Sequence, residues 1–226
     1  MAGTVTRRRR RHSIEEYDAL PEGEWCEFID GQMFDMVAAP GSAHQAVAMD
    51  LGRQFANFLL GKPCQVFPAP YEVRLPEARP GRKKDFTVVL PDLVVVCDPA
   101  RRTPRGCLGA PDLVVEILSP ATVSHDQVRK LNLYERHGVR EYWIVHPEGT
   151  VMVFHLGPDA RYGRPRTFAR DQQVPVGVLE GCSIDLTTVF PGPATEAPAP
   201  GSRRGGVPAV REPAAPYRRK PAPRRG

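Results

Sequence analysis

The sequence has few cysteines and no motif that pairs them. Its five cysteines are an odd number, and none of them lies in a CxxC motif. The odd count argues against a disulfide framework, and the absence of CxxC pairs argues against a zinc ribbon. We therefore expect a protein of the reducing cytoplasm that is stabilised by an apolar core, for which a hydrophobic content of 41% is sufficient.

Long apolar runs are missing as well. No run approaches the length that a helix needs to span a bilayer, so we expect no membrane as a partner. The arginine run Arg7–Arg11 is followed by polar residues and not by an apolar segment, which argues against a secretory signal. We find no internal repeat, and 226 residues suffice for one domain with tails.

Positive charge is missing from the central part of the chain. Residues 1–12 contribute five arginines and no acid, and residues 191–226 contribute a net charge of +6. Because the whole chain carries +5, a net charge of −6 is left for residues 13–190. The two ends hold almost no large apolar residue, so we predict a basic disordered head at 1–12, a domain at 13–190 and a disordered Pro- and Arg-rich tail at 191–226. Such tails either attach loosely to nucleic acid or only keep the protein in solution.

Apolar residues at helical spacing predict three helices. The first begins at Ser13, where a glutamate three residues further on completes a capping-box pattern. The second covers residues 43–60, with Ser42 as its N-cap. The third covers about residues 122–138 and ends at a glycine.

Between these helices the pattern indicates strands. Asp30-Gly31 favours a tight hairpin turn between two short strands. The Val-rich runs 92–97 and 112–118 are typical of strands that are buried on both faces. Further strands are expected at 71–75, 141–145, 151–156 and 173–179. Strands mixed with few helices predict an α/β or α+β domain with a mixed sheet.

Two acidic residues stand at unusual positions in the Val-rich strands. Asp92 follows a proline at the entrance of the first, and Glu116 interrupts the apolar run of the second. A buried carboxylate is costly unless it is paired, protonated or bound to a metal. If the two strands are neighbours, Asp92 and Glu116 converge at one end of the sheet and suit Mg²⁺ or Mn²⁺. A local cap or salt bridge of Glu116 is the structural alternative.

Further polar residues are candidates for the same site. Asp126, Lys130 and Tyr134 are spaced by four and share one helix face, either as site residues or as a surface Asp–Lys pair with a neighbouring tyrosine. His44 opens the inward face of the second helix, either as a core or capping histidine or as a residue that lines the site. Glu27 lies in a hairpin strand, either as a structural residue or as a residue that lines the site.

Taken together, these residues resemble the Uma-two-type family of bacterial restriction endonucleases, a branch of the PD-(D/E)XK superfamily. The resemblance covers about residues 13–190. It rests on Pro91-Asp92, on the segment from Asp112 through Glu116 to Pro120, on Asp126, Lys130 and Tyr134, on the segment 138–147, on Glu27 to Gly31 and on Ser42 to His44.

This resemblance implies an αβββαβ restriction-endonuclease-like core and a Mg²⁺- or Mn²⁺-dependent site for phosphodiester hydrolysis. It places the catalytic, metal-binding carboxylates at Asp92 and Glu116. The usual lysine of the superfamily, two residues after the glutamate, would fall on Leu118, which cannot do its task. The resemblance assigns that task to Lys130 in the following helix. The residues that would line the site are Glu27, His44, Asp126 and Tyr134.

Three functions agree with these observations. The first is a metal-dependent endonuclease that cleaves phosphodiester bonds in DNA. The second is a nuclease-fold module that binds nucleic acid with little or no turnover, which the acidic core favours because a DNA-cleaving surface usually makes basic contacts. The third is a metal-free acid–base hydrolase, which Lys130 disfavours because it would hold both carboxylates in the charged form. We expect DNA as the partner and leave a homodimer open.

Overall fold

The computed structural model describes residues 11–21, 23–35, 41–77, 85–118 and 125–190. It divides the chain into the units Met1–Pro191 and Gly192–Gly226, and the second unit lies outside the described residues. Most of the predicted head and the whole predicted tail lie outside them too, so the disorder of both stays a prediction. Within the described ranges, no helix is long and apolar enough to cross a membrane.

The three predicted helices are present. Helix α1, Ile14–Asp18, begins with the capping box that the sequence predicts from Ser13. Helix α2, Ser42–Leu59, differs in one detail: its N-cap is Gly41, which has the extended conformation of a cap residue, so Ser42 already lies inside the helix and the predicted Ser42 cap is wrong. Helix α3 spans His125–His137 and is followed by a glycine at a φ of 80°.

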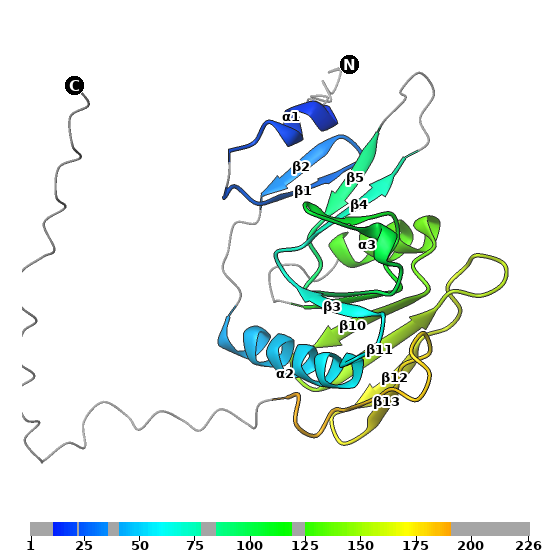
Figure 1. The fold of residues 1–226 in the computed structure, drawn as a ribbon. Helices are drawn as coiled ribbons and strands as arrows, with labels where there is room; N and C mark the ends of the chain where they lie inside the picture. Colours follow the sequence, from blue (N-terminus) through cyan, green and yellow to red (C-terminus); the bar gives the residue numbers. More distant parts are fainter. Residues whose placement is uncertain (1–10, 22, 36–40, 78–84, 119–124, 191–226) are drawn as a thin grey trace, which may run out of the picture. The chain divides into compact units, whose positions relative to one another are not determined.

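A six-stranded mixed sheet forms the centre of the domain (Figure 1). Its order is β12-β11-β10-β9-β6-β3, with β9 and β10 parallel and the other neighbours antiparallel. In chain order, α2, β3, β6, β9, α3 and β10 follow the predicted αβββαβ arrangement, with strands of a second sheet inserted between β3 and β9, which confirms the fold class. The strand bounds are β3 Gln65–Pro68, β6 Leu93–Val96, β9 Leu113–Ile117, β10 Glu141–His146, β11 Thr150–His155 and β12 Arg166–Ala169.

A second six-stranded sheet, of order β2-β1-β5-β4-β8-β7, lies in the same unit. Its β1–β2 hairpin turns at Asp30 and Gly31, both with positive φ, as the sequence predicts. The strand bounds are β1 Cys26–Ile29, β2 Gln32–Asp35, β4 Glu72–Pro76, β5 Phe86–Val89, β7 Arg102–Thr103 and β8 Gly106–Leu108. The 3-10 helix η1, Pro99–Arg101, precedes β7, and the strands β13 Gln173–Pro175 and β14 Ser183–Asp185 form a separate pair.

Strands β6 and β9 are buried on both faces, as their Val-rich sequences predict. One set of alternating residues, including Val95 and Val115, packs under α2 against Leu51 and Phe55. The other set, including Val114, packs against α3 and residues of the second sheet. The central sheet is therefore covered on both sides, and polar side chains can reach β6 and β9 mainly at the strand ends.

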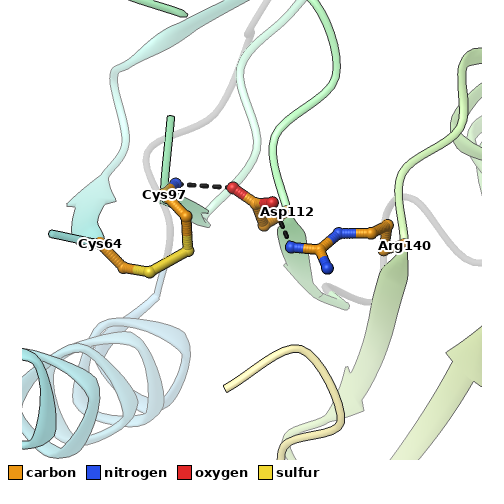
Figure 2. Close-up of a disulfide and its surroundings, with 4 residues drawn as sticks. All are labelled: Cys64, Cys97, Asp112 and Arg140. Atoms are coloured by element: carbon orange, nitrogen blue, oxygen red, sulfur yellow. Dashed lines mark hydrogen bonds and ion pairs between the residues drawn. A yellow bond between two sulfur atoms is a disulfide. The ribbon is translucent and has the colours of Figure 1, made fainter. Parts of the chain in front are cut away.

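The odd cysteine count argued against disulfides, but the structure contains one. Cys64 and Cys97 form a disulfide between the start of β3 and the end of β6 (Figure 2). They are 33 positions apart in the sequence, and the register that pairs Gln65 with Val96 places them opposite each other. No short motif encodes this contact, because it arises from strand pairing. The other cysteines, Cys26, Cys107 and Cys182, are buried and form no disulfide.

Candidate active site

The strand register brings Asp92 and Glu116 together. Strands β6 and β9 are antiparallel neighbours, as expected, with Leu93 opposite Val115 and Val94 opposite Val114. One step further along this register, Asp92 lies opposite Glu116. Glu116 is buried at 9% exposure, and Asp92 is half-buried at the entrance of its strand. The two carboxylates therefore meet at one end of the central sheet.

Both carboxylate oxygens of Asp92 are held by neighbouring groups. Oδ2 accepts a hydrogen bond from the backbone N–H of Ile117 at 2.7 Å. Oδ1 lies 3.2 Å from Nε2 of His44, which projects from the first turn of α2. This hydrogen bond raises the pKa of His44 above its usual value of 6.5, and partial burial opposes the rise. His44 is thus in contact with Asp92 and is not a residue of the apolar core.

Glu116 is held by two side chains of α3. Its Oε1 accepts a hydrogen bond from the Tyr134 hydroxyl at 2.6 Å and lies 3.0 Å from Nζ of Lys130. The same Nζ lies 2.9 Å from Oε1 of Glu27, which also accepts the backbone N–H of Leu90 at 3.1 Å. Lys130 therefore bridges two carboxylates from different sheets.

The geometry separates the alternatives for the α3 residues. Lys130 is only 8% exposed, so the surface-pair interpretation is wrong for the lysine. Tyr134 is fully buried, and burial raises its pKa well above 10, so its hydroxyl remains a hydrogen-bond donor to Glu116. The side chain of Asp126 lies outside the described residues. Leu118 stands where the superfamily usually has its lysine, is 8% exposed and packs in the apolar cluster under α3. An apolar side chain in this position carries no charge that could act in place of the lysine.

Negative charge exceeds positive charge at this site. Within the described residues, the carboxylates of Glu27, Asp92 and Glu116 face one lysine, Lys130, and the imidazole of His44. Burial raises the pKa of Glu116 to about 7, Lys130 opposes the rise, and the charges of Asp92 and Glu27 add to it. A further cation at this end of the sheet would offset the excess.

Glu116 should make the stability of the metal-free protein depend on pH. The pKa of Glu116 is about 7 in the folded protein and 4.5 in the unfolded chain. The favourable contribution of this group to the free energy of unfolding is therefore complete below pH 4.5 and is lost as the pH rises through 7. We expect the Glu116→Gln variant to equal the wild type near pH 4.5 and to exceed it at pH 8 by on the order of 1–3 kcal/mol. Urea unfolding in EDTA across this pH range measures the difference. A variant that is much less stable than the wild type at pH 8 would show that the charged carboxylate is structural.

Sequence reasoning missed the backbone contributions to the site. The N–H groups of Ile117 and Leu90 hold Asp92 and Glu27, respectively. No sequence signal could have found them, because every residue except proline carries such a group and only the strand register decides where it points. The sequence did single out the side chains of the site, since polar residues at helical or alternating spacing are visible in it.

The donor set fits a hard divalent cation. Within the described ranges, no group of three or more His, Cys, Asp or Glu side chains could enclose a metal ion, which a structural zinc site would need. Mg²⁺ and Mn²⁺ need fewer protein ligands, because they keep water and take phosphate oxygens from a substrate. Asp92 and Glu116, backed by an excess of negative charge, meet that requirement.

An αβββαβ scaffold with two carboxylates and a lysine at one end of its sheet is restriction-endonuclease-like. The family model Uma2, described as "Putative restriction endonuclease", matches residues 14–187, and the chain belongs to this family.

Two further proteins are similar to this chain, one in sequence and one in fold. An uncharacterized protein of Synechocystis sp., slr1290, is 28% identical over 151 residues, which is 65% of this chain and 75% of that protein. The crystal structure described as a putative nuclease belonging to DUF820 from Anabaena variabilis is similar in fold, with a TM-score of 0.63 and 22% identity. That match covers 79% of this chain and 97% of the Anabaena chain.

Proposed function

We propose that this chain is a metal-dependent endonuclease that hydrolyses phosphodiester bonds in DNA. The observation that carries the proposal is the juxtaposition of Asp92 and Glu116 across two paired strands, with the Lys130 ammonium 3.0 Å from Glu116. Membership of a family described as restriction endonucleases supports it. We expect the protein to act on DNA in the cytoplasm, and a homodimer is left open.

Asp92 and Glu116 are the residues that would hold Mg²⁺ or Mn²⁺. When bound there, such an ion lowers the pKa of a water molecule and offsets charge on the phosphodiester. Asp92 is oriented for this task by the backbone N–H of Ile117 and by His44. Glu116 is oriented by Tyr134, whose buried hydroxyl fixes the position of Oε1.

Lys130 supplies the positive charge that the chain itself brings to the reaction. Its ammonium is held between Glu27 and Glu116, beside the carboxylate that is proposed to bind the metal. In this position it can donate a hydrogen bond to an attacking water and stabilise negative charge as it develops on the phosphate. Glu27 keeps the ammonium in place, and Asp126 is proposed to line the site from the start of α3.

Incubation with supercoiled plasmid and Mn²⁺ tests the proposal. The wild-type protein should convert the plasmid to nicked and linear forms, and the Glu116→Gln variant should not, because a neutral amide is a poor ligand for a hard cation. EDTA should stop the wild-type reaction. Plasmid that is bound but left intact would favour a module that binds nucleic acid without cleaving it. Cleavage that persists in EDTA would favour a metal-free hydrolase.

A further inference from the structure

The two bonded cysteines occupy a surface position that the other cysteines do not share. Cys64 lies between α2 and β3, and Cys97 follows β6 directly. Both are half-buried, whereas Cys26, Cys107 and Cys182 are at most 5% exposed. Cys64 and Cys97 are therefore more exposed to a small thiol in solution than the three buried cysteines are.

The disulfide fastens an edge strand to the strand that leads from Asp92. In the central sheet β3 has β6 as its neighbour and lies at the edge. Its end distant from Cys64 continues into Ala69, whose backbone N–H donates a hydrogen bond to the carbonyl of Asp92 at 3.0 Å. Strand β3 is thus paired with β6 along its length, and two further links lie at its ends, the disulfide at one end and the hydrogen bond to Asp92 at the other.

Helix α2 also contacts Asp92 and leads into the disulfide-bonded segment. His44 in its first turn contacts the Asp92 side chain, and Cys64 follows shortly after its last residue, Leu59. The segment from α2 to the end of β3 therefore approaches Asp92 twice, through the imidazole of His44 and through the amide of Ala69. The disulfide is the covalent link that closes this segment onto β6.

Cys97 is fixed independently of the bond. Its backbone N–H donates to Oδ2 of Asp112 at 2.6 Å, and Asp112 also forms an ion pair with Arg140 (Figure 2). These contacts involve no sulfur atom, so they persist when the disulfide opens. Opening should loosen Cys64 and the adjoining end of β3, which stays paired with β6, while Cys97 stays in place, ready for the bond to form again.

We propose that Cys64 and Cys97 are a reversible thiol–disulfide site for small thiols such as glutathione, and that closing the bond holds β3 in place beside Asp92. In the closing reaction one cysteine thiolate attacks glutathione disulfide and releases one glutathione. The second cysteine thiolate attacks the resulting mixed disulfide and releases the other glutathione. Two protein thiols become one S–S bond, and two electrons and two protons pass to glutathione disulfide, which becomes two glutathione molecules.

Two measurements on the full chain test this proposal. Alkylation with iodoacetamide in glutathione redox buffers, read by mass spectrometry, should label Cys64 and Cys97 together as the buffer becomes reducing, and return to oxidising buffer should reverse this state. Hydrogen exchange of the Ala69 amide and the β3 amides should become at least about tenfold faster in the reduced protein. The amides of β10 and β11, on the far side of the sheet, should not change.

The Cys64→Ser/Cys97→Ser double variant is the matched control. Its β3 amides should exchange at the rate of the reduced wild type in both buffers. Cys182→Ala, which changes a buried free cysteine, should keep the redox dependence. The proposal fails if Cys64 and Cys97 are alkylated in the fully oxidised protein, or if reduction leaves the exchange of β3 and Ala69 unchanged. Neither readout requires the chain to cut DNA, so this result is independent of the proposed nuclease activity.

Discussion

Replacement of Lys130 by Met should lower plasmid cleavage by at least about 100-fold while metal binding persists. The ammonium lies 3.0 Å from Glu116 and 2.9 Å from Glu27, and it is the one cation that α3 brings to both carboxylates within the described residues. Its loss removes the donor proposed to orient water and stabilise charge on the phosphate. Single-turnover cleavage in Mn²⁺ measures the rate, and calorimetric titration with Mn²⁺ measures the binding.

The same substitution should destabilise the metal-free protein. It leaves Glu27 and Glu116 buried without their cation, a loss that typically costs about 3–5 kcal/mol. A divalent cation should restore much of this stability by taking over the charge of the lysine. If Lys130→Met cleaves as fast as the wild type, the lysine is a structural counter-ion and the catalytic proposal for it is wrong.

Two companion variants sharpen the Lys130 experiment. Arg129→Met removes a neighbouring positive charge that lies over the Phe34 ring, 4.4 Å from its centroid, and it should change the rate only a few-fold. Leu118→Lys in the Lys130→Met background restores the usual spacing of the superfamily. Leu118 directly follows β9, two residues after Glu116, and packs on the same face as Val114, so part of the rate should return.

The Asp92→Asn variant should lose both metal binding and cleavage, the latter by about 1000-fold or more. An asparagine has nearly the shape of the aspartate. Its carbonyl oxygen can still accept the Ile117 N–H, and its amide can donate to His44. The free energy of unfolding in EDTA should therefore change by no more than about 1 kcal/mol. Calorimetry with Mg²⁺ and Mn²⁺, together with the plasmid assay, separates the lost charge from a lost fold.

Asp112→Asn is the matched control for Asp92→Asn. Asp112 also follows a proline at the entrance of a Val-rich strand, but it lies at the opposite end of the pair and binds the Cys97 N–H and Arg140. Its substitution should affect stability and leave metal binding intact. Equal loss of metal binding in both variants would contradict the assignment of Asp92 as a ligand.

The sequence by itself determined the helices, about half of the strands and the side chains of the candidate site. Alternation and helical spacing predicted the three helices, the hairpin at Asp30-Gly31 and the two Val-rich strands, because these patterns reflect local geometry. Glu116 was visible as a carboxylate in an apolar run, and Lys130 and Tyr134 as residues on one helix face. Strand β3, Gln65–Pro68, is among the strands that escaped notice, because at the sheet edge it shows neither an alternation of buried and exposed residues nor a fully apolar run.

Only the tertiary structure decided how these parts meet. The β6–β9 register set Asp92 opposite Glu116, and the packing of α3 brought Lys130 to Glu27, a residue of the other sheet. The same long-range pairing joined Cys64 to Cys97, against the expectation from the cysteine pattern. Such contacts depend on register and on the packing of segments far apart in the chain. The pattern of neighbouring residues in the sequence does not specify these long-range contacts.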